Sequence, residues 1–399
     1  MKRLMGFMLL LAVVFCSVGC LGPVELDENG YVVTIGCDRG KEKKYFFTFA
    51  LQRGLSEPGT DMEGGAALLT SEGDAIDDAV RSLEKRLSCM LSFSRTNFFV
   101  FNREIAEAGD IEELLSISFD SLKIRPFAAV VVSECEAYRF IGGMTANNDA
   151  NVKKLQSALL LDDRKSGMAS VMSVSLLFEA AKGGAFDYTA ALGDENDEII
   201  TDAGQKKDQN EGKDPLEDFS SGDMAGGLKT SITGTALFDG WRMTGKLTGE
   251  GSLWLDIACG SFKEGTVTLD TGYGKVSLML KLKSVKRELV FEEGIPKAHV
   301  LAKLESGTHS APEAFPEEDF DDWLKNEAPR LMEAECRRVF LICRDANSDA
   351  MRFGTEAVKR FSSYEQWLSY CWKSHYSELE ASFTVELVNA DKTAGGGLL

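Results

Sequence analysis

Histidine is scarce in this sequence, and the usual motifs of catalysis and metal binding are missing. His299, His309 and His375 are the three histidines, and none stands at the spacing of a metal or catalytic motif. The sequence has no Cys-x-x-Cys pair for zinc or redox chemistry and no Gly-x-Ser-x-Gly turn of a serine hydrolase. It therefore predicts no catalytic residues, no metal site and no cofactor site, and it favours a binding or scaffolding protein over an exported hydrolase.

Positive charge is also in deficit. The chain has 44 Lys and Arg against 63 Asp and Glu, which gives a formal net charge of −19. A surface of this sign repels nucleic acid and the headgroups of anionic lipids. The composition therefore argues against a nucleic-acid partner, and a membrane attachment would have to come from something other than a basic patch.

Nine cysteines do not make a disulfide framework here. If Cys16 is removed with a signal peptide and Cys20 carries lipid, seven remain, an odd number without short spacings. Several of them, such as Cys37, lie in apolar surroundings, where a buried free thiol is ordinary. The sequence therefore predicts free cysteines.

The N-terminus has the pattern of a bacterial lipoprotein signal peptide. Lys2 and Arg3 precede an apolar run at 4–18, and small residues stand directly before Cys20. The run is shorter than the roughly 20 residues that a transmembrane helix needs. A plain secretory signal, in which Cys20 is incidental, is the alternative. We predict a signal peptide at 1–19 and lipid attachment at Cys20, which would anchor the mature chain to a membrane face.

The first half of the mature chain alternates strands and helices. Strand-like runs at 31–35 and 45–51 flank a turn and predict a hairpin. From Glu72 onward, apolar residues recur at helical spacing. Short apolar strands then alternate with helices up to about residue 190. We predict an N-terminal α/β-type domain at 20–192, followed at 193–229 by an acidic, Gly-rich linker or loop.

The second half predicts a run of antiparallel strands and then helices. Asp239-Gly240 between apolar runs indicates a hairpin, and further strands follow, one of them at 253–257. Pro329 is expected to kink or restart a helix that begins at Glu317. We predict an antiparallel β domain at 230–310 and a C-terminal helical region at 311–399 that contains a final strand at 383–388. The predicted fold class is α+β, with about three mixed domains built around small sheets.

The order of these segments resembles the Ger(x)C family, the C subunits of spore-germination nutrient receptors. The matching residues are Cys20, Glu25-Leu26, Ile35-Gly36-Cys37-Asp38, 98–106, 234–238, 245–247, 349–354 and Trp367. The likeness spans nearly the whole chain. The sequence departs from the family pattern in three places: Leu21-Gly22 follow Cys20 where Trp-Asp is usual, Arg95 replaces a common His, and Arg352 replaces a common Gly. The chain resembles a divergent member.

The resemblance implies a lipoprotein on the outer face of the spore inner membrane, held in membrane lipid by an acylated Cys20. It implies integral-membrane A and B subunits as partners, no enzymatic activity and a part in nutrient-triggered germination. The alternative is a solute-binding lipoprotein of a transporter. That class needs two α/β lobes with a ligand cleft between them, and the antiparallel run at 231–306 fits it poorly.

Overall fold

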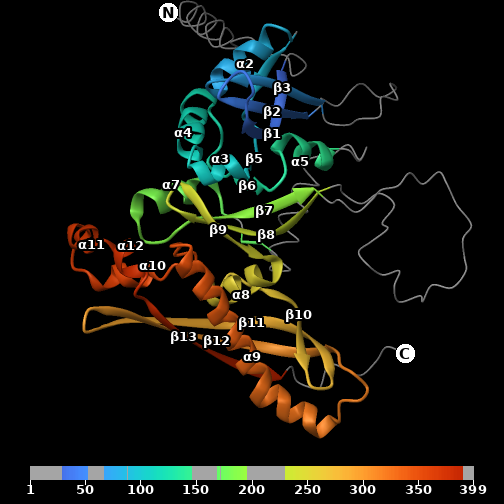
Figure 1. Ribbon diagram of the computed structural model, residues 1–399, viewed down its shortest axis with the longest axis vertical. Helices are drawn as coiled ribbons and strands as arrows, with labels where there is room; N and C mark the ends of the chain where they lie inside the picture. Colours follow the sequence, from blue (N-terminus) through green and yellow to red (C-terminus); the bar gives the residue numbers. More distant parts are fainter. Residues whose placement is uncertain are drawn as a thin grey trace, which may run out of the picture.

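The computed structural model describes residues 29–52, 67–87, 89–145, 169–170, 172–195 and 230–389. Figure 1 shows two sheets along the long axis of the molecule, the N-terminal one at the top and the C-terminal one at the bottom. The predicted signal peptide, Cys20 and residues 196–229 of the predicted linker lie outside the described residues. In the part of the chain that is described, no helix is both long enough and apolar enough to cross a bilayer.

The first sheet contains nine strands within the described residues. They are β1 (Asn29–Arg39), β2 (Tyr45–Gln52), β3 (Ala67–Gly73), β4 (Met90–Ser92), β5 (Phe98–Asn102), β6 (Ala129–Ser133), β7 (Thr189–Glu195), β8 (Thr230–Asp239) and β9 (Arg242–Thr248). Their order is β3-β2-β1-β5-β6-β7-β8-β9, with β4 also beside β1. The pairs from β1 through β5 and β6 to β7 are parallel, and antiparallel pairs extend the sheet at both ends. The antiparallel pairing of β1 with β2 confirms the predicted hairpin.

Helices cover both faces of this sheet, which explains why its central strands are continuous apolar runs. The helices are α2 (Ile76–Glu84), α3 (Arg103–Ala108), α4 (Ile111–Leu122), α5 (Ala137–Thr145) and α7 (Val174–Gly183). On β6, Val130 and Val132 join the core that contains residues of α2, α3, α4 and α7. Val131 faces the opposite core, with Phe140 and Ile141 of α5. The first sheet is therefore an internal layer.

The second sheet has four strands within the described residues. They are β10 (Glu264–Thr271), β11 (Gly274–Glu292), β12 (Ile295–Ser310) and β13 (Glu380–Asn389), in this order. β10, β11 and β12 are antiparallel, and β13 runs parallel to β12. Val276, Leu278 and Leu280 of β11 are buried, whereas Met279 and Lys281, which alternate with Leu278 and Leu280, are exposed. One face of this sheet therefore covers a core and the other meets solvent.

Two helices cover the inner face of the second sheet. They are α8 (Gly249–Cys259) and α9 (Glu317–Asp345), and Figure 1 shows α9 lying across the strands. Leu255 of α8 and Met332 of α9 share one core with Leu280 and Leu304 of the sheet. Short helices follow α9: α10 (Gly354–Ala357), η3 (Val358–Arg360), α11 (Tyr364–Tyr370) and α12 (Trp372–Tyr376). The structure confirms the predicted α+β class and the C-terminal helical region with its final strand.

Some local predictions were wrong. The strand predicted at 253–257 is the middle of α8, whose side chains from Leu253 to Ala258 are all buried. A helix that is buried all round has no 3.6-residue pattern, so periodicity cannot distinguish it from a strand. α9 is one element from Glu317 to Asp345, so the helix does not restart at Pro329, and the kink given as the alternative stays a prediction.

The grouping of strands into sheets also differs from the sequence-based expectation. β8 and β9, expected in an antiparallel domain beginning at 230, pair through β7 with the first sheet. Pairing with a distant strand leaves no local signal in the sequence. The division of the chain into domains at 192, 229 and 310 stays a prediction.

Candidate functional site

The residues that the sequence singled out for chemistry do not come together. Cys20, the predicted lipid attachment site, lies outside the described residues. His299 shares a hydrogen bond of 2.9 Å with the Ser382 hydroxyl, and His375 stacks on the ring of Tyr370. Among the described residues, no three His, Cys, Asp or Glu side chains are grouped as a metal site would require. His299 and His375 therefore lie at separate packing contacts.

The first family-like motif holds a helix on the first sheet. Asp38 ends the Ile-Gly-Cys-Asp run on β1, and its carboxylate accepts the backbone N–H groups of Ala137 at 2.7 Å and Tyr138 at 3.0 Å. These are free donors at the N-terminus of α5. Burial raises the pKa of Asp38 to about 6, and both hydrogen bonds oppose that rise. At Gly36 a Cβ would meet the Ile141 side chain at 2.6 Å, so glycine is what lets α5 sit close to β1.

The second family-like motif, at 349–354, folds around a buried carboxylate. The Asp349 side chain accepts the backbone N–H groups of Phe353 at 2.8 Å and Gly354 at 2.7 Å. It also accepts the indole N–H of Trp372 at 3.0 Å. A Cβ at Gly354 would clash with the backbone carbonyl of Ala185. The motif therefore forms a tight loop that packs against residues preceding β7.

A set of polar residues next to this loop connects the two halves of the molecule. We call Asp187, Asp239, Asn347, Asp349 and Lys373 the carboxylate junction. The Asp187 carboxylate accepts the backbone N–H of Asp349 at 2.6 Å and pairs with Lys373. Lys373 also lies 2.9 Å from Asp239, which accepts the Asn347 amide at 2.8 Å. The junction thus joins β8 and the segment before β7 to the end of α9 and to α12.

Burial controls the charge of the junction. Asp349 is fully buried, and this raises its pKa to about 7, with a further contribution from the nearby Asp187 carboxylate. Burial likewise raises the pKa of Asp187, although the Lys373 ammonium opposes the change. The carboxylate oxygens are occupied by backbone, indole and ammonium donors. The arrangement can hold segments of chain together, and the Lys373 ammonium is engaged in ion pairs with Asp187 and Asp239.

Sequence reasoning found Asp349 and missed its partners. Asp239 belonged to the predicted hairpin turn, and the structure confirms that turn between β8 and β9. Asp187 and Lys373 lie 186 positions apart in the chain. The one local signal was an acid, Asp187, between Phe186 and Tyr188, where an unpaired charge would be costly to bury.

Comparison with known proteins agrees with these motifs. The family model described as "Spore germination protein N-terminal domain" matches residues 22–183. The one described as "Spore germination B3/ GerAC like, C-terminal" matches residues 233–388. The chain belongs to the Ger(x)C family. At Asp38 and Asp349 the hydrogen bonds described above give a structural reason for the residue that the family motif carries.

Two known proteins show how far the similarity to individual relatives extends. Spore germination protein KC of Bacillus subtilis (strain 168) is 27% identical over 142 residues, which are 33% of this chain and 34% of that protein. The chain thus aligns with about a third of the length of this curated relative. The crystal structure of the GerBC protein has a TM-score of 0.53 at 10% identity, with 89% of this chain and 97% of that chain covered. This likeness shows that the Ger(x)C chain has the same overall fold.

Proposed function

We propose that this Ger(x)C protein is a membrane-anchored, non-enzymatic subunit of a spore germinant receptor and contributes to nutrient-triggered germination. In this proposal an acylated Cys20 holds it on the outer face of the spore inner membrane, beside integral-membrane A and B subunits. The observation that carries the proposal is the pair of family matches, which together extend from residue 22 to residue 388.

The anchor is supported by the sequence before the first strand. Cys20 follows an apolar run and small residues, and only eight residues lie between it and Asn29, where β1 begins. Two or three acyl chains on one cysteine provide the two hydrophobic signals that stable anchoring takes. A short connection of this kind would keep the first sheet close to the membrane surface.

The non-enzymatic role is supported by the use made of the motif carboxylates. Asp38 and Asp349 bind backbone N–H groups in buried positions. The presence of these two carboxylates in the family motifs is therefore explained by their part in holding the fold together. We infer that the protein acts through its surfaces.

The anchor is tested by a Cys20→Ala variant expressed from its own locus. We expect loss of fatty-acid incorporation, loss of the protein from the spore membrane fraction and a weaker response to nutrient. A Cys16→Ala variant is the matched control, because it removes a thiol from the predicted signal peptide and should leave all three unchanged. Full lipid incorporation in the Cys20→Ala spores would contradict the anchor.

The receptor role is tested by deleting the gene and exposing spores to amino acids, sugars and nucleosides. We expect loss of the response to one nutrient class, with germination by a receptor-independent trigger intact. If the deletion instead abolished uptake of a solute by vegetative cells and left germination normal, the transporter alternative would replace the receptor.

A further inference from the structure

A long groove runs beside β10, on the second sheet and away from the carboxylate junction. One side is the strand itself, from Glu264 to Asp270, and the other side is formed by α8 and α9. Leu253 and Trp254 of α8 and Leu331 of α9 give that side an apolar wall. Its volume is 1230 Å³, above the roughly 300–1000 Å³ of pockets that take small ligands. We call it the β10 groove.

The backbone groups that face the groove can be identified from the strand register. Leu282 donates its N–H to the Lys263 carbonyl at 2.9 Å, so this pair is hydrogen-bonded. In an antiparallel ladder such pairs alternate with pairs that are not bonded, and the β10–β11 register has no shift. The N–H and C=O groups of Glu264, Thr266, Thr268 and Asp270 therefore point away from β11, toward the open edge.

This edge carries only part of the protection that natural edge strands have, namely the negative charges of Glu264 and Asp270. β10 reads Glu-Gly-Thr-Val-Thr-Leu-Asp-Thr, without lysine, proline or a bulge. The opposite edge of the same sheet differs, because α9 lies against β13 and the Glu333 carboxylate accepts the backbone N–H of Val385 at 3.0 Å. One edge strand is covered by a helix, while the other borders a groove.

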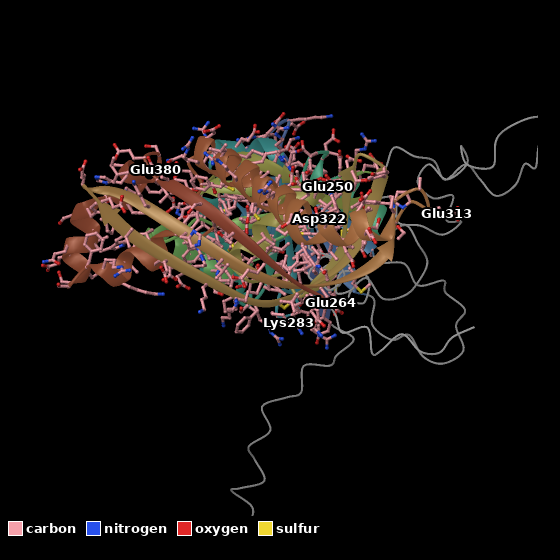
Figure 2. All side chains as sticks on the ribbon, turned by 90° about the horizontal axis from the view of Figure 1, so that it is seen from below. Glu250, Glu264, Lys283, Glu313, Asp322 and Glu380 are labelled. Carbon is pink, nitrogen blue, oxygen red and sulfur yellow. The ribbon has the colours of Figure 1, made fainter. Side chains whose placement is uncertain are left out.

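The charge around the groove selects the occupant. Glu335 and Arg338 form an ion pair at 2.7 Å and neutralise each other. This leaves Glu250, Glu264 and Asp270 against Lys275, an excess of negative charge. Figure 2 labels Glu250 and Glu264 at the end of the molecule that carries the second sheet. A second copy of this chain, with a formal net charge of −19, would bring like charge to the site.

We propose that the β10 groove binds an extended, cationic segment of a partner protein, which adds to β10 as a fifth strand of the second sheet. Main-chain hydrogen bonds to the four outward-facing residues of β10 supply affinity, and the apolar wall accepts alternate side chains. Lysine or arginine on the segment meets Glu264 and Asp270. The proposal makes no use of the Cys20 anchor, so the inference stands or falls independently of the proposed function.

The test uses the full chain and a synthetic peptide of about nine residues with alternating lysine and valine, long enough to pair with all of β10. We expect saturable binding, with slower hydrogen exchange at the amides of Glu264, Thr266, Thr268 and Asp270. A glutamate–valine peptide of the same length should bind at least about tenfold more weakly. Equal binding of the two peptides, or protection elsewhere, would overturn the proposal.

Variants separate strand addition from simple charge attraction. Thr266→Pro removes an edge-facing N–H without changing charge or the ladder to β11, and we expect about a tenfold loss of lysine–valine peptide binding. Thr266→Val is the matched control and should bind normally.

If Thr266→Pro does not fold, as judged by circular dichroism, Glu264→Lys with Asp270→Lys provides the test. It should weaken binding far more than Glu313→Lys with Asp322→Lys, which makes the same charge change elsewhere on this end (Figure 2).

The competing occupant is a second copy of this chain. Sedimentation of the full chain should give a species whose mass does not depend on the residue at position 266. A dimer that dissociates on Thr266→Pro would show that β10 pairs with itself, and it would overturn the proposal of a cationic partner.

Discussion

Asp38 and Asp349 are two buried carboxylates in two family-like motifs, and they act on different scales. Asp38 is 6% exposed and binds two N–H groups of α5, which packs on the same sheet as β1. Asp349 is fully buried, closes its own loop, and donates its backbone N–H to Asp187 beside the first sheet. The first attaches one helix to one sheet, and the second connects the two halves of the molecule. Similar chemistry thus supports local packing in one region and long-range architecture in the other.

The largest effect is expected for Asp349→Ala. The substitution leaves three buried donors without an acceptor, the N–H groups of Phe353 and Gly354 and the indole of Trp372. Because each unsatisfied buried donor costs about 1–3 kcal/mol, we expect the free energy of unfolding to fall by at least about 3 kcal/mol. Urea denaturation followed by tryptophan fluorescence measures it. Asp345→Ala, at an exposed acid four positions earlier, should change it by less than about 0.5 kcal/mol. A similar small change at both positions would refute the bridging role.

A second prediction concerns pH. The Asp349 carboxyl has an ordinary pKa of 3.8, which burial raises to about 7 in the folded protein. Between these values the folded chain binds more protons than the unfolded chain, so the carboxyl's contribution to stability is complete below pH 3.8 and is lost as the pH rises through 7. Asp349→Asn cannot ionise. The wild type should therefore lose stability relative to Asp349→Asn between about pH 4 and 7, as urea titrations would measure. A constant difference across that range would contradict the raised pKa.

A smaller and more local effect is expected for Asp38→Ala. It removes an acceptor from two N–H groups at the start of α5, a loss comparable to that of a helix cap, about 1–2 kcal/mol. Hydrogen exchange should accelerate in α5 (Ala137–Thr145) while β11 keeps its protection. Equal acceleration in both elements would mean that Asp38, like Asp349, supports the whole molecule.

Patterns within short segments predicted much of the fold. The hairpin of β1 and β2 and the strands β5, β6, β10 and β13 follow from apolar runs, alternation and turn residues. α8 could not be recognised, because a helix buried on all sides has no polar face to give it a period. The strand assignment at 253–257 failed for this reason.

The candidate site was less accessible to sequence reasoning than the fold. Asp38 and Asp349 were named as parts of motifs, and their roles became clear only from their partners. Asp187 contacts Asp349 across 162 positions of the chain, and the pairing of β8 with β7 crosses the segment 196–229. Contacts between distant segments depend on the tertiary arrangement, and a single sequence carries no periodic signal for them.

The smallest change in stability is predicted for Arg352, in the loop that Asp349 closes. At this position the sequence departs from the family's common glycine. Arg352 has φ +58°, in the left-handed region that favours glycine, and its guanidinium lies 5.0 Å from the centre of the Phe186 ring. Arg352→Gly removes backbone strain of about 1 kcal/mol and loses the ring contact, so we expect a gain of at most about 0.5 kcal/mol. Arg352→Ala keeps the strain, loses the contact and should destabilise. Thermal unfolding of both variants measures the difference. If alanine were as stable as glycine at this position, the Asp349 loop would not require the left-handed conformation, and the departure from the family pattern would carry no structural cost.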